Sequence, residues 1–335
     1  TDIRIERDQT VNQSIPVTII TTPSKKLKYS TSIGYGTDTG ARLGLSVLNR
    51  RVNKSGHRRQ YSAQLSEIES NAAARYIIPI GNINTEYVEL FSNVHQEIVN
   101  DTDTTQYSVG TSMNQNRWGG RRRLSLTLLQ EQFSFDEKDD QKSSLLIPGL
   151  VYNYKKADKV LFARSGYSFT GDFHGGIESN ISETSFFHSR ISGRSIFPLG
   201  SKTRLLNRLE LGAIISDEFE ELPPSERFFT GGSQSVRGYD YKDIGPRNIL
   251  DNNIGGKYLI ASSIEVDYLA WGNLGFALFY DVGDATSDNN FSLKTAAGLG
   301  FRYRSVIGMV RIDLAHPFED PDNDVRLHIS IGPDL

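Results

Sequence analysis

Apolar and polar residues alternate one by one along much of this chain. The alternation is clearest over residues 29–35, 124–128, 276–283, 310–315 and 325–331. A period of two places successive side chains on opposite faces, as in a β-strand, and the 3.6-residue period of a capped helix is hard to find. The turn at 37–40 is followed by a second alternating run, 43–47, which predicts a hairpin. The pattern therefore predicts an all-β protein.

Charged side chains within the alternating runs decide between two all-β architectures, a soluble sandwich or barrel and a transmembrane barrel. Glu265, Arg302, Arg311 and Asp313 all occupy the polar face of their runs. A soluble protein would have to bury these charges, whereas a membrane barrel turns its apolar face to lipid and its polar face to a wet lumen. Strand–turn–strand units recur roughly every 20 residues, which gives about sixteen strands, an even number. We therefore predict a transmembrane antiparallel β-barrel over residues 27–335.

The first 26 residues do not follow this pattern. They begin with a charged stretch, continue into a short apolar run at 15–20 that contains Pro16, and end in the breaker sequence 23–26. A proline suits an edge strand, because it cannot donate to a ladder. We predict that residues 1–26 are the tail of a preceding domain together with a linker.

The connections between the runs fall into two groups by length. Tight turns are predicted at 79–82, 116–120, 197–200 and 270–273, and longer polar loops at 99–105, 136–144, 178–185 and 217–257. In outer-membrane barrels the short turns face the periplasm and the long loops face outside. Both termini of an even-stranded barrel are then predicted to lie in the periplasm.

Composition and single residues limit the chemistry further. The chain has 335 residues, a formal net charge of −3 and no cysteine, so neither a thiol site nor a nucleic-acid partner is expected. No apolar run approaches the ~18 residues of a membrane-spanning helix. The six histidines show no ligand-like spacing, and the glycine-rich stretch 34–40 is interpreted as a hairpin turn instead of a dinucleotide loop. We expect no enzyme activity, no metal and no other cofactor.

The stretch 228–239, inside the longest predicted loop, has an unusual composition. It combines two adjacent phenylalanines, Gly231 and Gly232, and the tetrad Val-Arg-Gly-Tyr at 236–239. Glycines permit positive φ angles and close backbone approach, which favours a defined conformation. A connection this long is typically either functional or disordered. From composition alone, a solvated loop and a functional loop are about equally supported.

The tetrad, together with the run Phe-Tyr-Asp-Val-Gly at 279–283, resembles the superfamily of outer-membrane insertases and translocators that includes BamA, TamA and the two-partner-secretion pores. The runs at 298–305 and 312–315 are similar to the closing strands of that superfamily. The first hairpin, 33–42, and the chain end, 331–335, are most similar to the TamA branch.

The resemblance implies a barrel of about sixteen strands whose long sixth loop folds back into the lumen, where the tetrad arginine meets acidic residues on strands twelve and thirteen. The implied loop lock consists of Val236, Arg237, Gly238, Tyr239, Glu265, Asp281 and Gly283. The alternation independently places Glu265 and Asp281 on the inward face. A guanidinium suits two carboxylates, since its fork donates bidentately and stays charged. The alternative is nonspecific pairing among luminal arginines and acids.

The same resemblance implies a non-enzymatic function in the bacterial outer membrane, namely insertion and secretion of other outer-membrane proteins, notably autotransporters. It implies two kinds of partner, client outer-membrane proteins and the inner-membrane-anchored protein TamB. TamB would be reached through periplasmic POTRA domains, of which residues 1–26 would be the tail. A role in lipid transport with that partner stays open.

The physical basis of such an activity would be a weak seam between the first and last strands. The first strand carries the small residues Gly34 and Gly36, and the last ends in Gly332-Pro333, whose proline cannot donate a hydrogen bond. The predicted seam residues are Tyr29, Ser32, Gly34, Gly36, Leu327, Ile329, Gly332 and Pro333. A seam with few bonds could open and pair with a client strand by β-augmentation.

Two other functions stay open on the sequence alone. A two-partner-secretion translocator or a plain diffusion channel would use the long loop as a plug, and a passive structural barrel would tolerate loss of the loop tip. A plug predicts higher conductance when the loop is deleted, with no dependence on client barrels.

Overall fold

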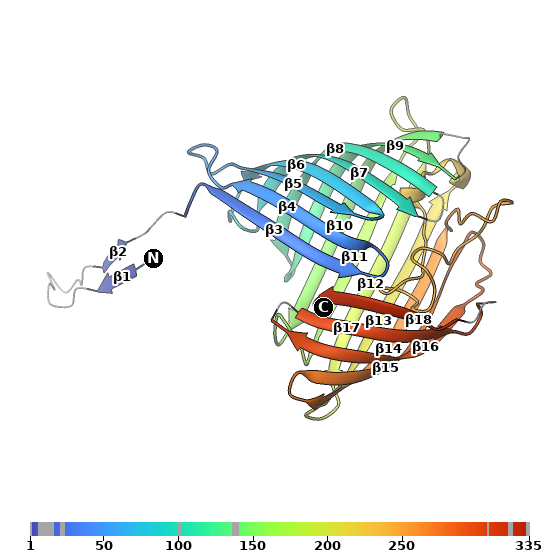
Figure 1. The fold of residues 1–335 in the computed structure, drawn as a ribbon. Helices are drawn as coiled ribbons and strands as arrows, with labels where there is room; N and C mark the ends of the chain where they lie inside the picture. Colours follow the sequence, from blue (N-terminus) through green and yellow to red (C-terminus); the bar gives the residue numbers. More distant parts are fainter. Residues whose placement is uncertain are drawn as a thin grey trace.

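A computed structural model of the chain describes residues 2–5, 17–20, 24–99, 102–135, 141–306, 308–320 and 324–332. Over these ranges the chain forms two antiparallel sheets (Figure 1). The smaller sheet pairs β1 (Asp2–Ile5) with β2 (Val17–Ile20). A two-stranded sheet does not identify a domain, so the assignment of residues 1–26 to the tail of a periplasmic domain and a linker stays a prediction.

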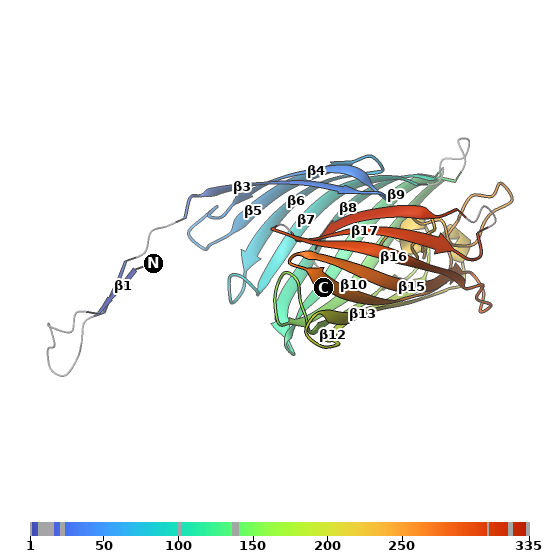
Figure 2. The same cartoon turned by 60° about the horizontal axis from the view of Figure 1, so that its bottom comes forward.

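The larger sheet has sixteen strands. They are β3 (Leu27–Gly36), β4 (Gly40–Asn49), β5 (Arg58–Ser66), β6 (Glu69–Pro79), β7 (Tyr87–Val99), β8 (Thr102–Arg117), β9 (Gly120–Ser134), β10 (Gln141–Ala157), β11 (Gly166–Gly176), β12 (Phe186–Pro198), β13 (Thr203–Ser216), β14 (Tyr258–Trp271), β15 (Leu274–Thr286), β16 (Lys294–Ser305), β17 (Gly308–Pro317) and β18 (Arg326–Gly332). Each strand pairs antiparallel with its neighbours in the sequence, and β3 and β18 are the edges. The sheet curls until these edges approach each other, which gives a nearly closed barrel (Figures 1 and 2). The predicted fold class and strand number are confirmed.

Side chains of the wall alternate between a lipid-facing and a lumen-facing side. On β15, Leu278 is 60% exposed, whereas its neighbours Ala277 and Phe279 are buried. On β14, Ile264 is exposed and Glu265 is buried. The outer face is apolar, as hydrocarbon requires, and the inner face carries the polar groups. The predicted inward and outward phases of both strands are confirmed.

The apolar core lies inside the barrel, under the connection between β13 and β14, which we call the long loop. The long loop covers residues 217–257, as predicted, and contains two short 3-10 helices, η2 (Phe219–Glu221) and η3 (Pro224–Glu226). Among the residues described, no helix is long and apolar enough to cross a membrane. Loop and wall side chains form one buried cluster that includes Phe219, Leu222, Phe228, Leu145, Ile214 and Leu259. Burial of this apolar surface favours the inward position of the loop.

Two of the predicted loops overlap strands. The stretch 99–105 is predicted as a loop, but β8 begins at Thr102, and its first residue pairs with the last residue of β7. The stretch 136–144 overlaps β10, which begins at Gln141. The loop prediction is wrong at 102–105 and at 141–144, because strands of this barrel continue past the apolar band with polar residues on both faces, held by their backbone ladders. Residues 136–140 lie outside the described ranges.

The four turns and four loops named from the sequence lie at opposite ends of the barrel, but connection length does not separate the two ends throughout. The end that carries the long loop also carries the short turns 37–39 and 67–68, whereas the opposite end carries the longer connections 50–57 and 158–165. A tight turn satisfies hairpin geometry at either end, so length alone does not give the orientation. The periplasmic placement of both termini stays a prediction.

Candidate functional site

A tight turn of the long loop presents the tetrad. Gly232 N donates to Val236 O (3.2 Å), and Ser235 N donates to Gly232 O (3.0 Å). Gly231, Gly232 and Gly238 have φ angles of 106°, 96° and 93°, a region of backbone space that favours glycine. The glycines noted in the sequence therefore shape this turn.

Arg237 occupies the centre of the site. Its Nε donates to Asp281 Oδ2 (2.7 Å), its Nη2 to Asp281 Oδ1 (2.9 Å), and its Nη1 to Glu265 Oε2 (2.7 Å). Asp281 Oδ2 also accepts from the Arg237 backbone N–H at 3.1 Å. Arg237 is 4% exposed and Asp281 is 0% exposed. The two carboxylates expected from the sequence thus contact the tetrad arginine, one of them in the bidentate geometry that a guanidinium favours.

The arginine is part of a larger ion network on the luminal side of β14–β17. Asp313 on β17 accepts from Arg237 Nη1 (3.2 Å) and from Arg302 Nη1 (2.6 Å). Arg302 on β16 also donates to Glu265 Oε1 (2.8 Å). Each of these carboxylates is shared between two guanidinium groups, which keeps the buried charges paired. The network therefore joins β14, β15, β16 and β17 to the loop.

Phe279 offers its aromatic face to the same guanidinium. The Arg237 Cζ lies 3.4 Å from the centroid of the Phe279 ring. A cation stacked on a ring is attracted by the negative face of the π-system, and its edges remain free to donate. Gly298 on the next strand makes room for the ring, since a Cβ there would lie 2.3 Å from Phe279 Cζ. Stacking and hydrogen bonding therefore use different faces of one side chain.

The other tetrad residues contact further strands. Val236 is fully buried against Gly283 of β15, where an added Cβ would lie 2.8 Å from Val236 Cγ2. Tyr239 Oη donates to Glu319 Oε2 (3.2 Å), just after β17. Gly238 contacts β18, as described below. The tetrad thus reaches most of the C-terminal strands at once.

The seven residues of the predicted loop lock lie together in the structure, and their role as a lock stays a prediction. Sequence reasoning missed three direct partners of Arg237, namely Ser263, Phe279 and Asp313. All three occupy the inward phase of their strands, which was the available signal. Alternation gives the face of a residue but not its register against distant strands, so the convergence could not be predicted.

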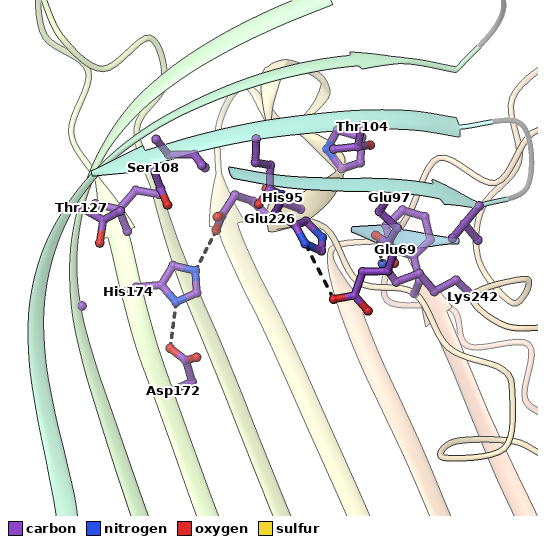
Figure 3. A pocket seen from close by; sticks show the side chains of 18 of the residues that line it. Glu69, His95, Glu97, Thr104, Ser108, Thr127, Asp172, His174, Glu226 and Lys242 are labelled. Atoms are coloured by element: carbon purple, nitrogen blue, oxygen red, sulfur yellow. Dashed lines mark hydrogen bonds and ion pairs between the residues drawn. The ribbon is translucent and has the colours of Figure 1, made fainter. Parts of the chain in front are cut away.

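The long loop also contacts the opposite wall (Figure 3). His174 of β11 lies between two carboxylates: Nδ1 is 2.9 Å from Asp172 Oδ1, and Nε2 is 2.7 Å from Glu226 Oε2 in η3. Ser225, also in η3, donates from its backbone N and its Oγ to Glu131 of β9. Both ring nitrogens face an acceptor, so the imidazole satisfies both when it carries two protons. The sequence offered no signal for this contact, because single histidines and acids on strands form no motif.

A cavity of about 620 Å³ lies between the long loop and β6–β11 (Figure 3). Its lining includes hydroxyl groups and ionisable groups, among them Ser108, Thr127 and His95. Lys242 of the loop crosses to Glu97 of β7, with Nζ 2.6 Å from Oε2. Among the described residues, no group of three or more His, Asp or Glu is arranged to hold a metal ion. The ion network thus fills the lumen beside β14–β17, whereas the lumen is hollow beside β6–β11.

The edges of the sheet, β3 and β18, are joined by few hydrogen bonds. Thr37 N donates to Ile329 O and Ile329 N donates to Thr37 Oγ1, both at 3.3 Å, and no ladder connects the edges within the described residues. Thr37 lies just after β3, so the strands meet at one end and diverge towards the other (Figure 1). By contrast, β17 and β18 pair continuously from Met309 to Ala315.

The predicted seam residues take different places along this gap. Gly36 lies beside β18, and a Cβ on it would be 3.7 Å from Ile329 O. The residues that pair with β4 and have no β18 partner within the described ranges are Tyr29, Ser32 and Gly34. The residues that pair with β17 are Leu327, Ile329 and Gly332. Pro333 lies outside the described residues. The role of this set as a lateral seam stays a prediction.

These features define a class of protein: a transmembrane β-barrel with a nearly closed seam and a loop held inside its lumen by an arginine–carboxylate network. Within that class, the chain belongs to the Omp85 superfamily, whose domain model matches residues 21–334. A barrel of this superfamily and fold is a protein of the bacterial outer membrane.

Two curated relatives are similar in sequence. The chain is 33% identical over 124 residues to the outer membrane protein assembly factor BamA of Nitratidesulfovibrio vulgaris, which covers 35% of this chain and 16% of the relative. It is 25% identical over 192 residues to BamA of Neorickettsia risticii, which covers 53% of this chain and 25% of the relative. The matched part of the chain thus spans at most a quarter of these relatives.

Solved structures share the fold. BamA from Haemophilus ducreyi lacking POTRA domains 1–3 has a TM-score of 0.84 at 14% identity, over 99% of this chain and 74% of that chain. CdiB from Acinetobacter baumannii has a TM-score of 0.59 at 15% identity, over 98% of this chain and 64% of that chain. At these identities the likeness shows the fold alone, and the barrel has more of the shape of this BamA than of this CdiB.

Proposed function

We propose that this barrel assists the insertion of client outer-membrane proteins by pairing their strands with the edge of its own sheet. The observation that carries the proposal is the seam. The edges β3 and β18 share two hydrogen bonds at one end, whereas the other neighbouring strands described form ladders. An unpaired backbone edge in hydrocarbon is strongly unfavourable, so a client strand that satisfies this edge is stabilised when it joins the sheet.

The names of the relatives support this function. Both curated relatives are outer membrane protein assembly factors. The proposed activity is not enzymatic, because strand addition exchanges hydrogen bonds and makes or breaks no covalent bond. The protein therefore acts as a template, and its clients are other barrels in the same bilayer.

A finer assignment rests on the sequence. The first hairpin, 33–42, and the chain end, 331–335, resemble the TamA branch. On this assignment the clients include autotransporters, and the partner is the inner-membrane-anchored TamB, reached through POTRA domains that precede the barrel. The curated relatives are BamA proteins, so surface autotransporter levels in depleted cells, compared with levels of general barrels, distinguish the two branches.

A disulfide across the seam tests the insertase function directly. Cysteines introduced at Gly36 or Thr37 are combined with cysteines at Ile329 or Ser330, and the chain has no native cysteine to interfere. Oxidation should block client assembly while the barrel stays folded, and reduction should restore assembly. A pair at Ile312 and Ile329, which are already register partners on β17 and β18, is the matched control. Client assembly at the unlocked rate in the seam-locked barrel would contradict strand exchange.

A second candidate function is a secretion or diffusion pore with the long loop as its plug. The cavity beside β6–β11 favours it, because removing the loop tip would extend this space. Deletion of residues 228–241 separates the candidates. A pore gains conductance and leaves client assembly unchanged, whereas an insertase loses client assembly.

A further inference from the structure

Both edges of the seam contact the same short segment of the long loop. Residues 233–238 contain the end of the glycine turn and most of the tetrad. This segment reaches Asp38, in the turn after β3, and His328, in β18. Arg237 of the same segment is anchored elsewhere, on β14, β15 and β17. One short segment therefore links the ion network to both free edges of the sheet.

Asp38 ties the first hairpin to the loop. Its Oδ2 accepts from Ser233 N (2.8 Å) and from Ser233 Oγ (2.6 Å). Hydrogen bonds to an ionised carboxylate are shorter and stronger than neutral ones. The close approach needs Gly232, since a Cβ on that residue would lie 3.0 Å from Asp38 Oδ2. A glycine of the loop turn thus serves a contact with the first hairpin.

His328 ties the last strand to the loop. Its buried Nε2 accepts from Gly238 N at 2.8 Å. Two residues earlier on the same face, Arg326 forms an ion pair with Asp240 of the loop. A Cβ on Gly238 would lie 3.2 Å from Pro317 N, so the tetrad glycine lets the loop approach β17 and β18 closely.

The two residues that hold the loop at the seam, Asp38 and His328, also face each other. Because His328 Nε2 accepts a hydrogen bond, the neutral imidazole carries its proton on Nδ1. Nδ1 lies 3.7 Å from Asp38 Oδ1, and it has no hydrogen-bond partner in the part of the chain described. A ring of four residues therefore spans the seam: Asp38, Ser233, Gly238 and His328. The contact between His328 and Asp38 is longer than a hydrogen bond.

We propose that this ring, which we call the seam clasp, couples the position of the long loop to the width of the seam. The edges share two direct hydrogen bonds. The loop adds two hydrogen bonds to the first hairpin, and one hydrogen bond and one ion pair to β18. Release of Arg237 from its carboxylates moves the segment 233–238, and both edges then lose these contacts. The use of the opened seam for clients rests on the proposed function.

Spin labels across the seam test the coupling in purified barrels in vesicles, without any client. Cysteines replace Tyr29 in β3 and Ile331 in β18, which are both exposed on the outer wall. The parent barrel should give one narrow distance distribution. Arg237→Ala should lengthen and broaden it, although the contacts of Arg237 lie on other strands. A coupling of ordinary strength raises the open population roughly 5- to 150-fold.

Two variants outside the ion network remove the ties one at a time. Asp38→Asn and His328→Phe should each broaden the distribution, and each should add little to Arg237→Ala, because the loop has then already left the seam. Ser330→Ala, on the same face of β18, is the matched control for His328. Glu67→Gln is the matched control for Asp38, since its carboxylate accepts from the first hairpin.

The outcomes separate the clasp from the proposed function. If Arg237→Ala exposes the loop to protease but leaves the label distances unchanged, the clasp is wrong. The clasp proposal is also wrong if Asp38→Asn and His328→Phe give the same label distances as their controls. If Arg237→Ala does not fold, these two variants alone test the proposal. If the distances respond while client assembly in cells does not, the clasp stands and the insertase function falls.

Discussion

The barrel wall has two halves that differ in how they are held. The C-terminal wall, β12–β18, carries the network around Arg237, and the tetrad packs against it. The N-terminal wall, β3–β11, borders the cavity and meets the loop through separate polar pairs, such as Lys242 with Glu97 and Glu226 with His174, and through apolar side chains of β9 and β10. At its free edge, β3 is exposed over its first seven residues. The strand pattern therefore builds the whole wall, while the ion network of the loop is confined to the C-terminal half.

The largest expected effect comes from removing Arg237, the centre of the ion network on the C-terminal wall. Breaking a buried ion pair by deleting one partner typically costs about 3–5 kcal/mol, because the stranded charges stay buried. Arg237→Ala leaves Asp281 and Glu265 in that state, and access of luminal water reduces the cost. New protease cuts between 228 and 241 should appear while the barrel stays folded. Arg190→Ala, which breaks a more exposed pair with Glu210, is the control and should change little.

Arginine substitutions sharpen the comparison between the two halves. Leu278→Arg places a charge in lipid and should destabilise the barrel by roughly 2–4 kcal/mol if the site is near the midplane. Ala277→Arg points into the filled half and should also be poorly tolerated. Ser108→Arg points into the cavity and should be nearly neutral in urea unfolding from vesicles. An equal loss of unfolding free energy in Ala277→Arg and Ser108→Arg would contradict the distinction between a filled and a hollow half.

A smaller effect is expected where the loop meets the N-terminal wall. His174→Leu leaves Asp172 and Glu226 facing each other without the imidazole, and an unsatisfied buried polar group costs about 1–3 kcal/mol. Proteolysis should increase around η2 and η3 and stay unchanged at the tetrad. Cuts at both places would show that the loop is released as one unit, against the idea of separate attachments.

The smallest effect concerns the acid response of Asp38. Burial by itself would raise its pKa, but the His328 imidazole and the two Ser233 donors outweigh burial and hold the pKa of Asp38 below its ordinary value of 3.8. Its contribution to loop docking is therefore fully present above pH 3.8 and is lost as the pH falls below that value. Pepsin cleavage of the loop should rise in this window in the parent and less in Asp38→Asn. The same acid response in both would remove Asp38 from the clasp.

The sequence predicts the wall and the centre of the site for a physical reason. Each strand turns every second side chain inward, so a period of two gives the fold class and the inward phase of Glu265 and Asp281. The tetrad then supplies the arginine. The ends of strands are harder to predict, because the polar residues of a strand beyond the apolar band have the composition of a loop. The predicted loop at 99–105 is wrong for that reason.

Contacts that depend on barrel closure could not be predicted. Asp38 and Ser233 are 195 residues apart in the chain, and Gly238 and His328 are 90 apart. Neither pair has a local pattern, since a turn aspartate and a strand histidine are ordinary in those positions. Their meeting depends on the curl of the sheet and the path of the loop, which alternation does not specify.

The order of residues along the chain has a consequence for how the barrel itself is completed. All the acidic partners of Arg237 lie later in the sequence than the arginine, and the last of them, Asp313, is on the second-to-last strand. The histidine that meets Gly238 is later still. Contacts of such high sequence separation form late, because the entropy of closing the intervening chain opposes them until the strands are in place. In a folding chain that has not yet formed its final hairpin, the long loop therefore lacks part of its binding site. The loop docks completely only after the last strand has joined the sheet.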